Sequence, residues 1–420
     1  MLKRKIFSLM FICFICIIST LLSISICNPC LANATRSMST SLTRFMVRDE
    51  YRCVYQTICC MYLTVPQDMT TTMIVNYQYN GPSLISSTVI VSANPFYIDG
   101  ELLIADGAVY YYNSKCFVVH QIKEDNRYQC WSDITGLTPG TTYFYASIVT
   151  ASDFQRNVST HHNYKFRTAS TNDSFTFVNG VGRQWNEPAI SLADLATATE
   201  PLFAMIGGDI IMNDGNGNCF LDWDYWFAMW HKHMTTPLGY TIPLLTSIGE
   251  REAGTFGAPR EWDSFYLHYF PHQIGLQDIN PQHRPTHHAH SINNLNILAL
   301  DTNVHTSISD QVDFIKSQLS TKTTKHIVLY DLPMAMPHGS HNSIEWLTSN
   351  QMKEQWLPLM TDARMVFENH ESPSDYQQIN KTFYFGTGVG DTALIVDTKD
   401  YCVKFLRNRE IHPKIICTTP

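Results

Sequence analysis

A short apolar run ends in glycines and a carboxylate, and it reads Leu202-Phe203-Ala204-Met205-Ile206-Gly207-Gly208-Asp209. An apolar run bounded by turn residues predicts a buried strand that is followed by polar side chains. Comparable runs stand at 175–178, 295–300, 326–330 and 365–367, and helix-length segments lie between them at 222–234 and 309–319. This alternation predicts stacked layers of helix and sheet from about residue 174 onward.

The chain before residue 169 has a different pattern, in which β-branched and aromatic residues alternate with polar ones. The stretch 143–148 is an example, and a Pro139-Gly140 turn stands just before it. Short strands at this spacing predict a β-sandwich. The polar segment 169–174 is then a linker, so the sequence predicts two domains, 38–168 and 174–420.

The N-terminus has the pattern of a secretory leader. Basic residues at positions 3–5 precede an apolar run from Ile6 to Ile26 and the small-residue cleavage site Ala32-Asn33-Ala34. The pattern predicts a signal peptide over 1–34, and a protein that is secreted or lies in the lumen of the secretory or endolysosomal pathway. The alternative is an uncleaved signal anchor that tethers the chain to a membrane, because the run is long enough to span a bilayer.

Composition narrows the possible partners and supports this compartment. The formal net charge is -8 and Lys/Arg runs are absent after the leader, which excludes an electrostatic nucleic-acid surface. After the leader, no apolar stretch reaches the length of a membrane span, so we expect no membrane contact after cleavage. The even set of cysteines after the leader predicts disulfides, with bridges inside the first domain and one at the C-terminus. These cysteines are Cys53, Cys59, Cys60, Cys116, Cys130, Cys219, Cys402 and Cys417.

Three sequons, at Asn157, Asn172 and Asn380, are expected to carry glycans in that compartment. The histidine-rich stretch 281–290 is interpreted as a polar surface loop, with metal binding as the alternative. Asp214, Asp301 and His338 are candidates for lining a cleft, but a capping or loop role is the preferred interpretation for each.

Polar segments follow the predicted strands of the second domain. In chain order they read Asn179-Gly180-Val181-Gly182, Gly208-Asp209-Ile210-Ile211-Met212, Gly249-Glu250-Arg251-Glu252, Val328-Leu329-Tyr330-Asp331 and Asn369-His370-Glu371-Ser372. Their order, spacing and flanking residues resemble the five motif blocks of purple acid phosphatases, a family of calcineurin-like metallophosphoesterases. In that family the blocks are GDxG, GDxxY, GNHE, VxxH and GHxH.

The resemblance spans about residues 65–390 and includes the leading domain, whose turn and strand at 134–145 resemble those of fibronectin type III-like domains. It implies an α+β, two-domain chain: a fibronectin III-like β-sandwich over 38–168, then a four-layer α/β/β/α metallophosphoesterase sandwich. It also implies a site in which two metals share one bridging aspartate, activate a water and clamp a phosphate.

Half of that site is missing when the motifs are carried over. The bridging aspartate is Asp209, but the first-block aspartate falls on Gly180, or on Asn179 if the strand slips by one residue. The family's tyrosine is Met212 and the last histidine is Ser372. Because the first metal keeps one plausible ligand, a dimetal iron centre is not expected.

The second metal's ligands are replaced by residues that still bind cations, namely Asp209, Glu250, Asp331 and His370. Three carboxylates and one imidazole suit a single Mn, Zn, Mg or Ca ion. The alternative is a salt-bridged cluster without metal, in which Arg251, at the place of the family's assisting histidine, is the counter-charge.

We therefore expect a catalytically impaired glycoprotein, a pseudophosphatase with a structural or anion-binding role. Arg251 is the candidate contact for phosphate or another small anion. A protein partner is also expected, but the sequence does not identify it. The alternative function is an active single-metal acid phosphatase that hydrolyses phosphomonoesters. A third is adhesion through the fibronectin-like domain.

Overall fold

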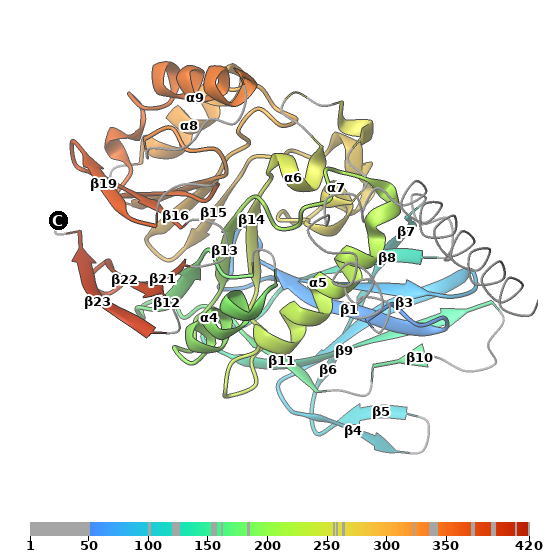
Figure 1. The fold of residues 1–420 in the computed structure, drawn as a ribbon. Coiled ribbons are helices and arrows are strands. Elements are labelled where there is room, and N and C mark those ends of the chain that lie inside the picture. The colour runs from blue at the N-terminus through green and yellow to red at the C-terminus, as the bar shows by residue number, and fades with distance from the viewer. Residues whose placement is uncertain are drawn as a thin grey trace, which may run out of the picture.

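The computed structural model describes the chain from residue 51 to 418 with short gaps (Figure 1). The described residues are 51–99, 102–119, 127–152, 158–160, 163–182, 185–254, 257, 259–262, 265–321, 324–335, 343–370, 374–387, 392–407 and 410–418. The predicted leader and the sequon at Asn157 lie outside them.

The N-terminal part is built from short antiparallel strands, as the alternating pattern predicts. These are β1 (Thr57–Thr64), β2 (Met73–Asn80), β3 (Leu84–Ser92), β4 (Phe96–Asp99), β5 (Leu102–Ala105), β6 (Val109–Asn113), β7 (Lys115–Val118), β8 (Arg127–Ile134), β9 (Thr142–Ala151), β10 (Val158–Ser159) and β11 (Tyr164–Arg167). One sheet has the order β1-β2-β8-β7, and the other has β10-β9-β3-β6 with β11 beside β9.

These two sheets share a core. Tyr77 of the first sheet is buried beside Val91 and Tyr145 of the second, and its hydroxyl hydrogen-bonds to Ser87 of β3. Each such aromatic or aliphatic side chain, once buried, contributes on the order of 1.5–3 kcal/mol. The β4-β5 hairpin projects away from this core (Figure 1).

The C-terminal part contains two larger groups of strands. The first comprises β12 (Thr176–Asn179), β13 (Ala204–Gly207), β14 (Leu244–Ser247), β21 (Thr392–Asp397), β22 (Cys402–Arg407) and β23 (Glu410–Cys417). The second comprises β15 (His288–Ile292), β16 (Leu295–Ala299), β17 (Lys325–Tyr330), β18 (Met365–Glu368), β19 (Tyr376–Ile379) and β20 (Thr382–Gly386). In both groups the central strands are parallel, and the predicted strands of this part are confirmed.

Helices connect these strands. They are α4 (Glu187–Thr197), α5 (Phe220–His233), α6 (Glu250–Ala253), α7 (Tyr266–Tyr269), α8 (Val312–Leu319) and α9 (Ser343–Gln355), with 3-10 turns η1 (Gly217–Cys219), η2 (Arg260–Trp262), η3 (Leu276–Asp278), η4 (Pro281–His283), η5 (Ser309–Gln311) and η6 (Met360–Asp362). The helices predicted at 222–234 and 309–319 are α5 and the η5-α8 segment.

Neighbouring residues on each strand point to opposite faces, so they pack in different parts of the core. Val178 and Ile206 pack with the helical core around α4 and α5, whereas Phe177 and Met205 pack in the core shared by the two sheets. On the second sheet, Val328 belongs to the core that includes residues of α8 and α9. The chain thus has a mixed α+β fold with large sheets.

The two parts of the chain share one continuous sheet of ten strands. Thr64 at the end of β1 pairs in parallel with Leu244 of β14. The buried Arg127 of β8 also pairs with Asp224 of α5, with 2.7 Å between Nη1 and Oδ1. The predicted boundary near residue 169 is thus crossed by backbone pairing and an ion pair. The identity of the sandwich as fibronectin III-like stays a prediction.

Disulfides join Cys53 to Cys59, Cys116 to Cys130, and Cys402 to Cys417. Two bridges lie in the N-terminal part and one closes the β22-β23 hairpin, as predicted. Cys219 is also disulfide-bonded, whereas Cys60 is a free thiol. Such bonds are typical of an oxidising compartment. In the described part of the chain, no helix combines the length and the hydrophobicity that crossing a membrane requires.

Candidate metal centre

The polar segments singled out in the sequence meet at the carboxyl ends of parallel strands. Gly180, Asp209 and Glu250 follow β12, β13 and β14 in one sheet, and Asp331 and His370 follow β17 and β18 in the other. Parallel strands end at the same edge of a sheet, and loops at that edge are where ligands bind in α/β folds.

Glycines allow these loops to approach closely. Gly208 has a φ of +76°, and a Cβ at this position would lie 2.6 Å from the Asp331 Cγ atom. A Cβ on Gly249 would lie 2.7 Å from the Asp209 backbone nitrogen. Asp209 itself has a left-handed φ of 53°, which is costly for a non-glycine residue and is tolerated where the surroundings enforce it.

Asp209, Asp331 and His370 form a buried group. One ligand atom from each lies within 4.8 Å of the others. The His370 Nδ1 atom is 3.1 Å from Asp209 Oδ2 and 3.6 Å from Asp331 Oδ1. Burial by itself lowers the pKa of His370, but Asp331 and Asp209 outweigh it and raise that pKa to about 11. In the protein without a cation, an imidazolium therefore compensates two carboxylates.

Glu250 belongs to a second buried group that shares His370 with the first. With Glu345 of α9 and His370 it forms a second set of ligand atoms within 4.8 Å of one another. Burial raises the pKa of Glu250 to about 7, against the opposing effect of Arg251. The Arg251 Nε atom is 3.4 Å from Glu250 Oε1, and its Nη1 atom is 3.7 Å from Asp214 Oδ1. The predicted counter-charge at Arg251 is present, but His370 shares that role.

The other half of the expected site offers few metal ligands among the described residues. A Cβ on Gly180, which has a φ of +84°, would lie 2.9 Å from the Thr387 Cβ and Cγ2 atoms. Asn179 is fully buried and exchanges side-chain hydrogen bonds with Asn369. Met212 is 41% exposed and has no ligating oxygen or nitrogen in its side chain. Ser372 lies outside the described residues.

The donor set therefore fits one cation. Carboxylate oxygens with one imidazole suit a hard or borderline divalent ion such as Mn, Mg, Ca or Zn. Asp209, Asp331 and His370 would hold it, and the expected fourth ligand, Glu250, falls instead in the neighbouring set with Glu345 and His370. When bound, such an ion would polarise a phosphoryl oxygen or a water.

The sequence did not lead us to predict a positioning role for Glu252. It is fully buried, and its carboxylate accepts hydrogen bonds from the backbone N–H groups of Gly249, at 2.7 Å, and Ile210, at 3.2 Å. It thereby joins the loop of Glu250 to the loop of Asp209. The signal was present, because a glutamate three residues after a helix N-cap typically caps the preceding backbone.

Glu368 has a similar positioning role for the loop that contains Asp331. Its Oε1 atom accepts hydrogen bonds from the Tyr330 hydroxyl at 2.7 Å and from the backbone N–H groups of Met334 and Ala335 at 3.0 and 2.9 Å. The strand pattern of 365–368 gave no sign that this position carries a carboxylate with a positioning function.

The remaining candidates have different outcomes. Asp301 accepts backbone hydrogen bonds from Val304, His305 and Thr306, which confirms the loop role. Asp214 contacts Arg251 at the rim of the candidate centre. His338 lies outside the described residues. Asn172 and Asn380 are exposed, so their glycosylation stays a prediction.

The interpretation of 281–290 as a polar surface loop is wrong at its C-terminal end. His288 and His290 belong to β15 and are 4% and 1% exposed. Their alternation with less buried neighbours is the period-two pattern of a strand, which the abundance of polar residues in this stretch concealed.

The fold is similar to that of a purple acid phosphatase, PPD1, from seeds of yellow lupin (Lupinus luteus). The TM-score is 0.65 at 11% sequence identity, and the match covers 85% of this chain and 73% of the lupin chain. A putative 5'-nucleotidase from Staphylococcus aureus gives a TM-score of 0.37 at 10% identity, covering 59% of this chain and 55% of that chain.

A predicted phosphoesterase from Streptococcus pneumoniae gives a TM-score of 0.26 at 10% identity, covering 59% of this chain and 99% of that chain. No family model matches the sequence, and no curated protein does. The lupin enzyme thus establishes a shared metallophosphoesterase fold, and at 11% identity the fold alone.

Proposed function

We propose that this chain is a secreted glycoprotein of the metallophosphoesterase fold whose hydrolytic centre is impaired, and that it binds phosphate or a related anion. The observation that carries this proposal is the contact between Gly180 and Thr387, which leaves no room for a ligand side chain at position 180. A second metal ion would lack its protein ligands there.

Loss of one of the two metal ions is expected to reduce the rate of hydrolysis strongly. In two-metal sites the ions together stabilise the attacking and leaving oxygens of the displacement. A single ion at Asp209, Asp331 and His370 would supply only part of that stabilisation. The family's assisting histidine corresponds to Arg251, whose guanidinium does not transfer a proton at ordinary pH. General acid catalysis of this kind contributes about 10²–10⁴-fold in rate.

Arg251 remains suited to hold an anion. Its side chain is 29% exposed, and its contacts with Glu250 and Asp214 are 3.4 and 3.7 Å long. A planar guanidinium recognises phosphate oxygens in a bidentate manner. A phosphate at the rim would then be attracted by Arg251 and positioned by the neighbouring cation, where one is bound.

Phosphate titration of the full secreted chain by calorimetry tests the anion role. We expect binding in the unmodified protein and at least about tenfold weaker binding in Arg251→Ala, because a charge-assisted contact contributes about 1.5–3 kcal/mol. Lys232→Ala removes an exposed positive charge from α5 and is the matched control. Equal affinity in Arg251→Ala and Lys232→Ala would refute the assignment.

A second candidate function is single-metal hydrolysis of phosphomonoesters, favoured by the convergence of Asp209, Asp331 and His370. Hydrolysis of an aryl phosphate across acid to neutral pH, with Mn, Zn or Mg added, separates the two. Impairment predicts the same low rate in the unmodified chain and in Asp209→Asn. A rate that Asp209→Asn reduces by orders of magnitude establishes the hydrolase.

A further inference from the structure

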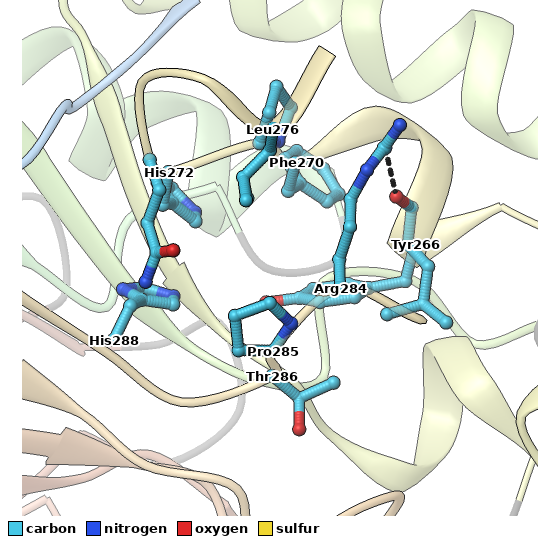
Figure 2. Close-up of a pocket in the computed structure, with 11 residues that line it drawn as sticks. Tyr266, Phe270, His272, Leu276, Arg284, Pro285, Thr286 and His288 are labelled. Atoms are coloured by element: carbon cyan, nitrogen blue, oxygen red, sulfur yellow. Dashed lines mark hydrogen bonds between the residues drawn. The ribbon is translucent and has the colours of Figure 1, made fainter. Parts of the chain in front are cut away.

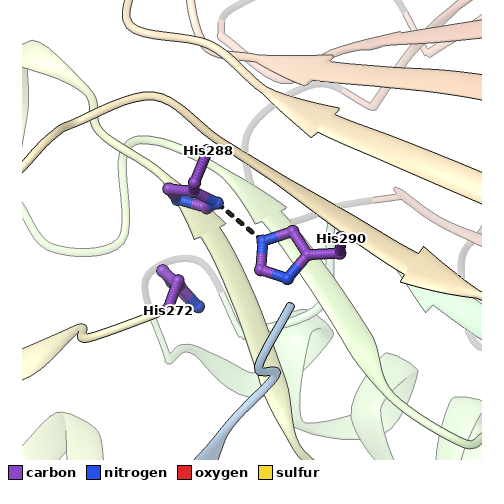
Figure 3. Close-up of side chains that lie close together, drawn as sticks. All are labelled: His272, His288 and His290. Carbon is purple, nitrogen blue, oxygen red and sulfur yellow. Dashed lines mark hydrogen bonds between the residues drawn. The ribbon is translucent and has the colours of Figure 1, made fainter. Parts of the chain in front are cut away.

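Three buried imidazoles form a cluster that the candidate phosphoesterase centre does not use. His272 follows α7, and His288 and His290 lie two residues apart on one face of β15 (Figure 3). They are 3%, 4% and 1% exposed. One ring nitrogen from each lies within 4.8 Å of the others.

Backbone groups fix the orientation of the three rings. The His290 Nδ1 atom is 2.8 Å from the Pro66 carbonyl oxygen. A carbonyl oxygen only accepts, so Nδ1 carries the proton and the lone pair of the neutral ring is on Nε2. That Nε2 atom lies 2.6 Å from His288 Nδ1. The His272 Nδ1 atom contacts the Val65 carbonyl oxygen at 3.3 Å, which places the His272 lone pair on Nε2.

A small cavity adjoins the cluster. It has a volume of about 20 Å³ and is lined by His272 and His288 together with Phe270, Arg284 and Thr286 (Figure 2). A cavity needs roughly 10–15 Å³ of this kind to hold one water. A fourth ligand can therefore be accommodated beside two of the three rings.

We propose that His272, His288 and His290 bind one Zn²⁺ ion, with a water in the adjoining cavity as the fourth ligand. Three imidazoles and a water are a common tetrahedral zinc environment, with Zn–N distances of about 2.0–2.1 Å. Carbonyl partners on the second ring nitrogen are the usual support for histidine ligands. The contacts of His272 with the Val65 carbonyl and of His290 with the Pro66 carbonyl have that arrangement.

Binding requires modest changes. A tetrahedral ion separates its nitrogen ligands by about 3.3 Å, so His288 and His290 move apart by less than an ångström from 2.6 Å. His288 also takes the tautomer with its proton on Nε2, which leaves its Nδ1 lone pair for the ion. His272 Nε2 exchanges its contacts with the Thr246 hydroxyl, at 2.9 Å, and the Thr246 backbone N–H, at 3.2 Å, for the ion.

The ion would tie together three distant segments. The Val65-Pro66 backbone directly follows β1 of the N-terminal part, Thr246 lies in β14, and His288 and His290 belong to the second sheet. Zinc would therefore stabilise the junction of the N-terminal part with both sheets, independently of the proposed anion function. A ligand that binds only the folded state raises stability as its concentration exceeds its dissociation constant.

Zinc binding to the full chain in an Asp209→Asn/Asp331→Asn background tests the proposal, because this background removes two ligands of the candidate phosphoesterase centre. We expect one Zn²⁺ per chain and a melting temperature that rises with zinc and saturates. His288→Gln should weaken binding by more than the roughly 10–100-fold that loss of an outer partner costs. His283→Gln, an exposed histidine of the same stretch, should leave binding unchanged.

X-ray absorption at the zinc edge gives a second readout that needs no substitution at the cluster. The proposal predicts three imidazole ligands and one oxygen ligand in the background variant. Oxygen-dominated coordination, no bound zinc, or affinity that is equal in His288→Gln and His283→Gln would overturn it. If His288→Gln does not fold, the absorption spectrum of the background variant decides alone.

Discussion

Thr387 fills the space into which a side chain at Gly180 would extend. The two residues come from loops that follow β12 and β20, one in each sheet, and a Cβ on Gly180 would lie 2.9 Å from the Thr387 side chain. The place of the first expected metal ligand is thus packed with protein atoms.

This contact predicts a difference between two glycine substitutions. Gly180 and Gly136 both have positive φ angles, +84° and +74°, but a Cβ on Gly136 meets nothing within 4 Å. Each change to Ala costs about 1–2 kcal/mol for the left-handed backbone. Gly180→Ala should cost about 1–3 kcal/mol more, because it overpacks against Thr387.

Urea unfolding measures both variants. Thr387→Gly should reduce the extra cost at position 180 and leave the cost at Gly136 unchanged. Equal losses for Gly180→Ala and Gly136→Ala would mean that the space at Gly180 is open.

We expect His370 to stabilise the cation-free protein by compensating its buried carboxylates. His370→Gln removes the positive charge that faces Asp209 and Asp331 at 3.1 and 3.6 Å. Removing one partner of a buried ion pair costs about 3–5 kcal/mol. We expect a loss of this size in urea unfolding with a chelator present.

Adding Asp209→Asn to His370→Gln should recover part of that loss, since one uncompensated charge disappears. A double variant that is less stable by the sum of the two single losses would show that the two side chains do not interact.

Glu252 predicts a link between the loops of Glu250 and Asp209. Glu252→Ala leaves the N–H groups of Gly249 and Ile210 without this acceptor. An unsatisfied buried donor costs about 1–3 kcal/mol. We expect lower stability and weaker phosphate binding, measured by urea unfolding and calorimetry. The exposed Glu261→Ala is the control, and a Glu252→Ala protein that matches it in both measurements would refute the link.

Asp68 predicts a pH dependence at the β1-β2 connection. Burial raises its pKa, but hydrogen bonds from Thr70 and Thr71 outweigh burial and lower the pKa below 3.8. A carboxylate with a depressed folded pKa stabilises the fold above its unfolded pKa, and that contribution disappears as the pH falls through the folded value.

The stability difference between the unmodified protein and Asp68→Asn should therefore be constant from about pH 5 to neutral and shrink below about pH 4. Thermal unfolding at several pH values measures it. A difference that grows on acidification would contradict the ionised Asp68.

Local patterns predicted much of this fold. The apolar run at 202–206 became β13, and the segment at 222–234 became α5, because both carry the period of their element over enough residues. The pairing of Thr64 with Leu244 was not predicted. That pairing joins residues far apart in the chain, and neither strand's own sequence specifies its partner.

The candidate site was likewise predicted only in part from the sequence. Asp209, Asp331 and His370 were predicted from motif positions at strand ends, and the structure brings them together. The Gly180–Thr387 contact and the partnership of His272 with β15 were not predicted, because each depends on how separate loops and sheets pack. Sequence patterns report periodicity and local turns, not these long-range approaches.

The central claim is that the candidate metal centre holds at most one cation. Elemental analysis of the full chain in a His288→Gln background, with and without Asp209→Asn, counts the ions that depend on Asp209. The account predicts a difference of one ion per chain or none. A difference of two would show that both metal positions bind, and would contradict it.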